Sequence, residues 1–194
     1  MVIKIHLYLF LVFAYMYALQ NLETFIISYF FIMLHELAHI VIARVISIKV
    51  YEIELLPIGI NAKYEKNISI QKELLISLAG PIASLLFYKV LSNSFFKSIN
   101  FFIAIINLIP LKPFDGGRII NAIITLICNE QIAKKISTFI QKTALNLLVI
   151  ISIFSVFKFK NYYLAIACIY IICIVKEELK NERFNDIIKY LQID

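Results

Sequence analysis

The sequence TFIISYFFIMLHELAHIVIARVISI, residues 24–48, is a predominantly apolar run with two histidines and a glutamate near its middle. About 20 apolar residues are enough for a helix to cross the roughly 30 Å hydrocarbon core of a bilayer, so a membrane-spanning helix is predicted here. An ionisable side chain at that depth costs about 2.5–3.5 kcal/mol on insertion scales. His35, Glu36 and His39 are therefore expected to have a function.

The composition of the whole chain agrees with a membrane protein. Of its 194 residues 61% are hydrophobic and 16% charged, and the mean hydropathy is +0.86. Soluble domains are about 45–50% apolar and about 25% charged, and a soluble fold of this size could not bury so much apolar surface. The net charge of +6 comes from lysines scattered between apolar runs, which argues against nucleic-acid binding. The three cysteines form no CxxC pair, which argues against a thiolate metal site.

The apolar runs predict an all-α polytopic membrane protein with about six transmembrane helices. A short membrane-associated β-hairpin or loop is expected between the second and the third. The crossings are placed at about residues 5–19, 24–48, 74–91, 95–127 (broken), 143–157 and 162–175. The first is interpreted as a retained span, because no small-residue cleavage site follows it. Residues 1–175 thus form a transmembrane domain, and residues 176–194 form a short charged tail.

Lysine and arginine are unevenly distributed over the predicted segments. With the N-terminus inside, the inside segments hold 14 of these residues and the outside segments hold four, while Arg44 lies within the second crossing. Cytoplasmic loops of membrane proteins are enriched in Lys and Arg. Both termini are therefore predicted to be cytoplasmic.

The segment between the second and third crossings is polar and mixed. Val50–Leu55 alternates in polarity, and Pro57 and Gly59 mark a turn, so a strand or hairpin is predicted, with a plain cytoplasmic loop as the alternative. As a strand, Val50–Leu55 is expected to offer an edge onto which an extended peptide pairs.

The residues His35-Glu36-Leu37-Ala38-His39 match the zinc-protease pattern HExxH. Residues four apart on a helix lie one turn apart on the same face, so both imidazoles can reach one ion. A carboxylate beside them can take a proton from the water that the metal activates. The alternative is a pair of core histidines with a paired glutamate and no metal.

Catalytic zinc usually has three protein ligands, so the two histidines leave one position to fill. The best candidate is Asp115, in the sequence NLIPLKPFDGGR at residues 107–118. Its two prolines interrupt a helix, and its two glycines let the backbone approach closely. Irregular backbone at membrane depth is tolerated where it is buried in protein or lines a watery cavity. The alternative is an Asp-Gly turn on the cytoplasmic side.

Three stretches together resemble the site-2 protease family of intramembrane zinc metalloproteases. They are HELAH at residues 35–39, AGP at residues 79–81, and NLIP at residues 107–110 with FDGGR at residues 114–118. The six-span form and the size are similar to the sporulation branch of that family. The tail at residues 176–194 is too short for the nucleotide-sensing domain that some members carry, so none is expected.

The resemblance implies an integral-membrane zinc endopeptidase that hydrolyses a peptide bond of a membrane-tethered protein, in the cell membrane or a sporulation membrane derived from it. A sigma-factor precursor is the implied substrate, and inhibitory membrane proteins are the implied regulators. One catalytic zinc ion would be bound by His35, His39 and Asp115, with Glu36 as general base and Asn107 holding the substrate peptide or the transition-state oxygen.

Three other functions compete with this interpretation. A membrane zinc protease of another kind would take further ligands from another His or Glu, but His6 is the sole other histidine. A zinc transporter or non-catalytic zinc-binding membrane protein needs ligands along a path on several helices, whereas this chain concentrates them at one point. An inactive scaffold that retains the motif stays open.

Overall fold

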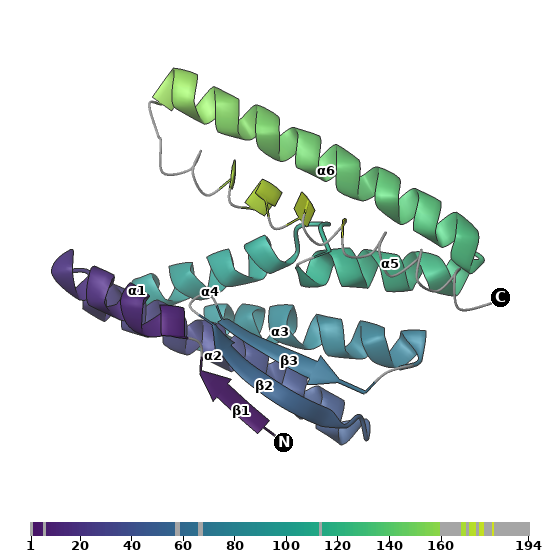
Figure 1. The fold of residues 1–194 in the computed structure, drawn as a ribbon, viewed down its shortest axis with the longest axis horizontal. Coiled ribbons are helices and arrows are strands. Elements are labelled where there is room, and N and C mark those ends of the chain that lie inside the picture. Colours follow the sequence, from purple (N-terminus) through teal and green to yellow (C-terminus); the bar gives the residue numbers. More distant parts are fainter. Residues whose placement is uncertain are drawn as a thin grey trace. The chain divides into compact units, whose positions relative to one another are not determined.

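The computed structural model describes residues 2–5, 7–56, 59–65, 68–112, 114–159, 168, 169, 171–173, 175, 176 and 180. The chain divides into two compact units, Met1–Leu108 and Ile109–Asp194. In the part that is described, both units are mainly helical, and the first also holds a small sheet (Figure 1).

Four helices make up most of the first unit. They are α1 (Leu7–Ala18), α2 (Leu22–Val45), α3 (Ile70–Val90) and α4 (Ser94–Asn107). α3 packs against both α2 and α4. Buried Phe31 of α2 joins the three helices, because its ring centroid lies 6.2 Å from that of Phe87 on α3 and 5.6 Å from that of Phe96 on α4.

The sheet has three strands in the order β1-β2-β3. The strands are β1 (Val2–Ile5), β2 (Val50–Leu56) and β3 (Gly59–Tyr64). β1 runs parallel to β2, and β3 is antiparallel to it, with an irregular register near Glu52. The predicted hairpin is confirmed by β2 and β3. The predicted free edge at Val50–Leu55 is wrong, because β2 is the central strand and is paired on both sides.

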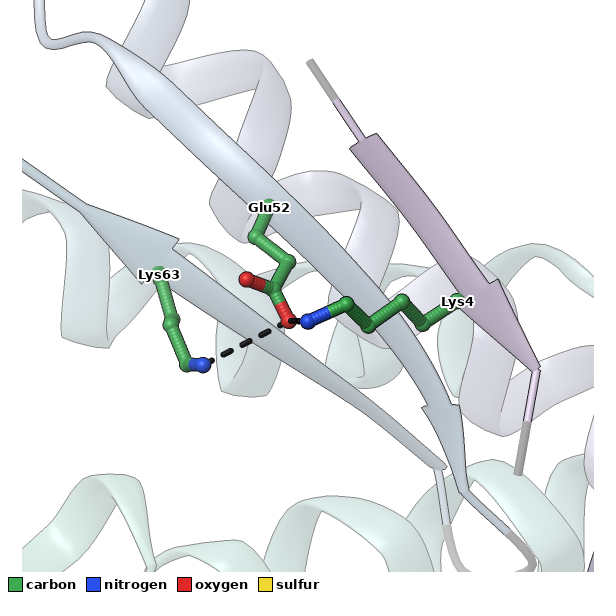
Figure 2. Close-up of polar contacts among 3 residues, drawn as sticks. All are labelled: Lys4, Glu52 and Lys63. Carbon is green, nitrogen blue, oxygen red and sulfur yellow. Dashed lines mark hydrogen bonds and ion pairs between the residues drawn. The ribbon is translucent and has the colours of Figure 1, made fainter.

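One carboxylate links the three strands. Glu52 of β2 lies between Lys4 of β1 and Lys63 of β3, with Nζ–Oε1 distances of 2.8 Å and 3.4 Å (Figure 2). The hydrogen bond from Lys4 is the main reason why the pKa of Glu52 lies below its usual value, and the same bond raises the pKa of Lys4. The parallel strand β1 is thus tied to the hairpin by charge as well as by its backbone.

The sheet is anchored to one end of the α2–α3 pair. α2 ends in a turn in which Ser47 takes a positive φ of 61°, and the Ile48 N–H donates to the Ala43 carbonyl. Ala43, Ile48 and Ile76 are buried together, with Val50 and Tyr64 of the hairpin packed against them. This cluster fixes where the chain leaves α2 and how α2 lies along α3.

The second unit contains α5 (Asp115–Ile127) and α6 (Glu130–Phe159), which pack against each other. Before α5 the chain is irregular, and its Leu111 is fully buried beside Ala144. A Cβ on Gly117 would collide with the backbone of Leu111 and Lys112, so glycine is needed for this close approach. Within residues 95–127, α4 ends before this irregular segment and α5 begins after it, and the broken crossing predicted there stays a prediction.

Three helices in the described part of the chain are long and apolar enough to cross a membrane: Leu22–Val45, Ile70–Val90 and Gln131–Lys158. The first two correspond to the second and third predicted crossings. The count of six crossings is not confirmed and stays a prediction.

The remaining predicted crossings differ from the helices. The stretch at 5–19 holds a helix of only 12 residues, with Ile5 in β1. The polar stretch before the fifth crossing is helical, because α6 begins at Glu130, where the Asn129 side chain accepts from the Ile132 N–H at 3.0 Å. The sixth crossing and the charged tail lie largely outside the described residues.

Candidate metal centre

The two histidines lie on the face of α2 that packs into the first unit. Phe31, His35 and His39 are spaced four residues apart, and all three are buried. The exposed fractions of the two histidines are 1% and 3%, and their ring centroids are 5.0 Å apart. The structure thus brings together the pair that the HExxH spacing predicts.

Both imidazoles are held through their Nδ1 atoms by residues of α3. Nδ1 of His39 lies 2.7 Å from the carbonyl oxygen of Ile76, and Nδ1 of His35 lies 2.9 Å from Oγ of Ser84. A carbonyl oxygen can only accept, so Nδ1 of His39 must carry the proton. The lone pair of that ring is then on Nε2, the atom that remains to ligate a metal.

The two Nε2 atoms face the same point on α3. A Cβ built on Gly80 would collide with Nε2 of His39 and would lie 2.5 Å from Nε2 of His35. The ligand atoms that the two rings offer are within 4.8 Å of each other. Two imidazole nitrogens converging on one point are a donor set that suits zinc, which binds histidine nitrogen at about 2.0–2.1 Å.

Glu36 follows His35 on α2 and is partly buried. It follows the buried stripe by one residue, so it lies on the side of α2 that adjoins the histidine pair, about 100° around the helix axis from His35. Arg44, in the last turn of the same helix, is exposed, which agrees with a side chain that extends toward the membrane surface.

The other two predicted site residues lie at helix ends. Asn107 is the last residue of α4, is partly buried, and donates from Nδ2 to the Ile103 carbonyl at 2.9 Å. Asp115 is the first residue of α5, in the second unit, and is buried. Their roles as substrate-positioning residue and third ligand stay predictions.

Sequence reasoning missed the contacts that hold the histidines. Ile76, Gly80 and Ser84 are four residues apart, so they form one stripe on α3. A glycine and a serine at helical spacing in an apolar span are a signal for close helix packing in membranes. The Ile76 carbonyl gives no such signal, because every residue carries one.

The model of the peptidase family M50 matches residues 91–151. This stretch includes Asn107 and Asp115 but not the two histidines. The chain is also similar to a curated zinc metalloprotease of Methanocaldococcus jannaschii, with 34% identity over 116 residues. That match covers 52% of this chain and 34% of the relative, so the chain spans about a third of the relative's length.

Among solved structures, the chain resembles a site-2 protease from Methanocaldococcus jannaschii. The TM-score is 0.66 at 25% sequence identity, and the match covers 91% of this chain and 90% of that chain. The likeness thus covers most of the chain, whereas the family model matches only residues 91–151.

Proposed function

We propose that this chain is an intramembrane zinc endopeptidase of the site-2 type, the class that all three comparisons support. The observation that carries the proposal is the buried histidine pair, whose Nδ1 atoms are anchored on α3 and whose Nε2 atoms converge. It lies on a helix apolar enough to cross a bilayer, where two unligated imidazoles would be costly.

The division of roles follows from the positions on α2. His35 and His39 bind the metal through Nε2, and Glu36 on their flank acts as general base. A zinc ion held there supplies a Lewis acid that polarises a peptide carbonyl and activates water. Glu36 takes the proton from the attacking water and passes it to the leaving amine. The burial of both histidines keeps bulk water away from their side of the site.

We propose Asp115 as the third ligand of the metal. Asp115 is buried at the first residue of α5, and a carboxylate is one of the side chains that bind catalytic zinc. A Cβ on Gly117 would collide with the Leu111 backbone, so the chain passes close to itself two residues after Asp115. Together with two imidazoles, a carboxylate completes a ligand set common in catalytic zinc sites.

Asn107 is proposed to position the substrate. It ends α4 directly before the irregular segment, and its Nδ2 bond to Ile103 fixes the orientation of its amide plane. A side-chain amide held in this way can hydrogen-bond an extended peptide or an oxygen that gains negative charge during the reaction.

The protein is proposed to be a multi-pass protein of the cell membrane, or of a sporulation membrane derived from it, with both termini in the cytoplasm. Its substrate is a membrane-tethered protein, for which a sigma-factor precursor is the proposed case, and inhibitory membrane proteins are its proposed regulators. The proposed membrane location is supported by three apolar helices that are long enough to cross a bilayer. The proposed orientation is supported by the distribution of Lys and Arg. The proposed substrate is supported by the resemblance to the sporulation branch.

The test is co-expression of the chain with a membrane-tethered sigma-factor precursor. Wild type should process the precursor, Glu36→Gln should not, and both should copurify with zinc. The matched control is Glu23→Gln, an exposed glutamate at the start of the same helix, which should process normally. Processing by Glu36→Gln at the wild-type rate would remove the mechanism.

Asp115→Asn tests the third ligand separately. It should lower the zinc content of the purified protein, because a neutral amide is a weaker zinc ligand than a carboxylate. Zinc content equal to wild type would leave Asp115 as a turn residue.

A further inference from the structure

We propose that one stripe of α3, formed by Ile76, Gly80 and Ser84, positions both histidines for metal binding. In this role Ser84 and the Ile76 carbonyl hold the two rings at Nδ1, and Gly80 leaves the space into which both Nε2 atoms project. The proposal rests on the zinc site proposed above. It assigns the residues that contact the two histidine ligands on the side of the ring opposite the metal.

The stripe matches the histidines in spacing and direction. His35 contacts Ser84, and His39, one turn further along α2, contacts Ile76, two turns earlier on α3. The two helices therefore run antiparallel at this point. Gly80 lies midway between the two anchors, where one turn separates it from each. Each imidazole is held at Nδ1, and both Nε2 atoms point toward Gly80, which has no side chain.

A substitution can remove the Ser84 anchor but not the Ile76 anchor, because only the first is a side-chain group. The His39 anchor is a backbone carbonyl, which any residue at position 76 supplies. The His35 anchor is the hydroxyl of Ser84, which is fully buried and 2.9 Å from Nδ1. A hydroxyl can accept the Nδ1 proton, so this contact is compatible with the tautomer that leaves the lone pair on Nε2, and metal binding at Nε2 requires that tautomer. Ser84 is thus a positioning residue that acts through His35.

Gly80 acts through space rather than through a bond. Its hypothetical Cβ would lie 2.5 Å from Nε2 and 2.7 Å from Cε1 of His35, and closer still to Nε2 of His39. These atoms belong to rings that are anchored at their far side, so they cannot move away without losing an Nδ1 bond. Any side chain at position 80 therefore displaces the nitrogens that bind the metal.

Ser77 provides a matched control on the same helix. Like Ser84 it is fully buried, but its Oγ has no hydrogen-bond partner in the described part of the chain. Ser77→Ala and Ser84→Ala thus make the same chemical change at the same burial, and only the second removes an anchor of a histidine.

The test measures zinc affinity of the full chain in detergent micelles by competition with a chromogenic chelator. Loss of a group that orients a metal-bound histidine typically weakens binding 10- to 100-fold, and Ser84→Ala should do the same. Ser84→Thr retains the hydroxyl and should bind like wild type, as should Ser77→Ala. The visible spectrum of the cobalt-substituted protein should change only in Ser84→Ala, because only there does the His35 ring reorient.

Zinc affinity of Ser84→Ala within threefold of wild type would overturn the proposal while leaving the zinc site intact. Equal weakening by Ser77→Ala and Ser84→Ala would also overturn it, because packing of α3 rather than the hydroxyl would then be responsible. A wild-type protein that binds no zinc would overturn the proposed function together with this inference.

Discussion

Replacing Gly80 by alanine should weaken zinc binding without preventing the protein from folding. The added methyl group would lie 2.5 Å from Nε2 of His35 and in collision with His39, so at least one ring must turn away from its anchor on α3. A buried hydrogen-bonding group left without a partner costs about 1–3 kcal/mol. That cost falls on folding of the metal-free protein, whereas loss of a group that orients a metal-bound histidine typically weakens binding 10- to 100-fold, so zinc affinity should fall about 10- to 100-fold for one broken anchor, and further for two.

The same substitution has two opposing effects on the helix. Glycine in a helix interior is about 1 kcal/mol less favourable than alanine, whereas Pro81 disfavours helical backbone for a residue that carries a Cβ directly before it. Gly80→Ala should therefore fold with wild-type helicity. Chelator competition in micelles measures the affinity, and circular dichroism measures the fold.

The control is Ile82→Ala, on the half-exposed face of the same helix, which should leave zinc affinity unchanged. A folded Gly80→Ala protein with zinc affinity within threefold of wild type would show that the two Nε2 atoms do not converge at Gly80 when metal is bound.

Two further predictions concern the first unit. The pKa of Glu52 in the folded protein is lowered, so the ionised carboxylate stabilises the pairing of β1 with β2. This stabilisation is complete above the ordinary carboxylate pKa of about 4.3, and it is lost as the pH falls through the lower pKa that Glu52 has in the folded protein. Hydrogen exchange of the Val2–Ile5 amides, corrected for intrinsic rates, should thus quicken in acid, and Glu52→Gln should be fast at neutral pH as well; equal protection in both proteins would contradict this. Phe31→Ala should lower the free energy of unfolding in mild detergent by about 3 kcal/mol through lost packing, whereas Phe30→Ala, at the exposed neighbouring position, should change it by less than about 0.5 kcal/mol; similar losses for both would contradict the packing account.

Local patterns predicted the features that depend on neighbouring residues. The HExxH spacing predicted that His35 and His39 share a buried face, because four residues make about one helical turn. Two prolines predicted the interruption between α4 and α5. Alternating polarity after α2 predicted a strand, and β2 begins at Val50 as expected.

Features that depend on distant residues were not predictable in this way. β1 joins the sheet through residues about 50 positions away, and its sequence Val2–Ile5 continues smoothly into an apolar run. The contact between His35 and Ser84 spans 49 positions and depends on the register of two packed helices. The early start of α6 was missed because hydropathy reports burial in lipid, whereas helix formation also occurs in polar sequence.

The proposed function requires that His35 and His39 hold a zinc ion and that the carboxylate of Glu36 assists hydrolysis of a peptide bond within the membrane. The direct measurement is cleavage of a purified, membrane-tethered substrate by the purified chain in liposomes, before and after removal of metal. Wild type should cleave, lose activity on chelation and recover it with zinc, whereas Glu36→Gln should bind zinc and stay inactive throughout. Cleavage that persists without zinc, or in zinc-loaded Glu36→Gln at the wild-type rate, would contradict the claim.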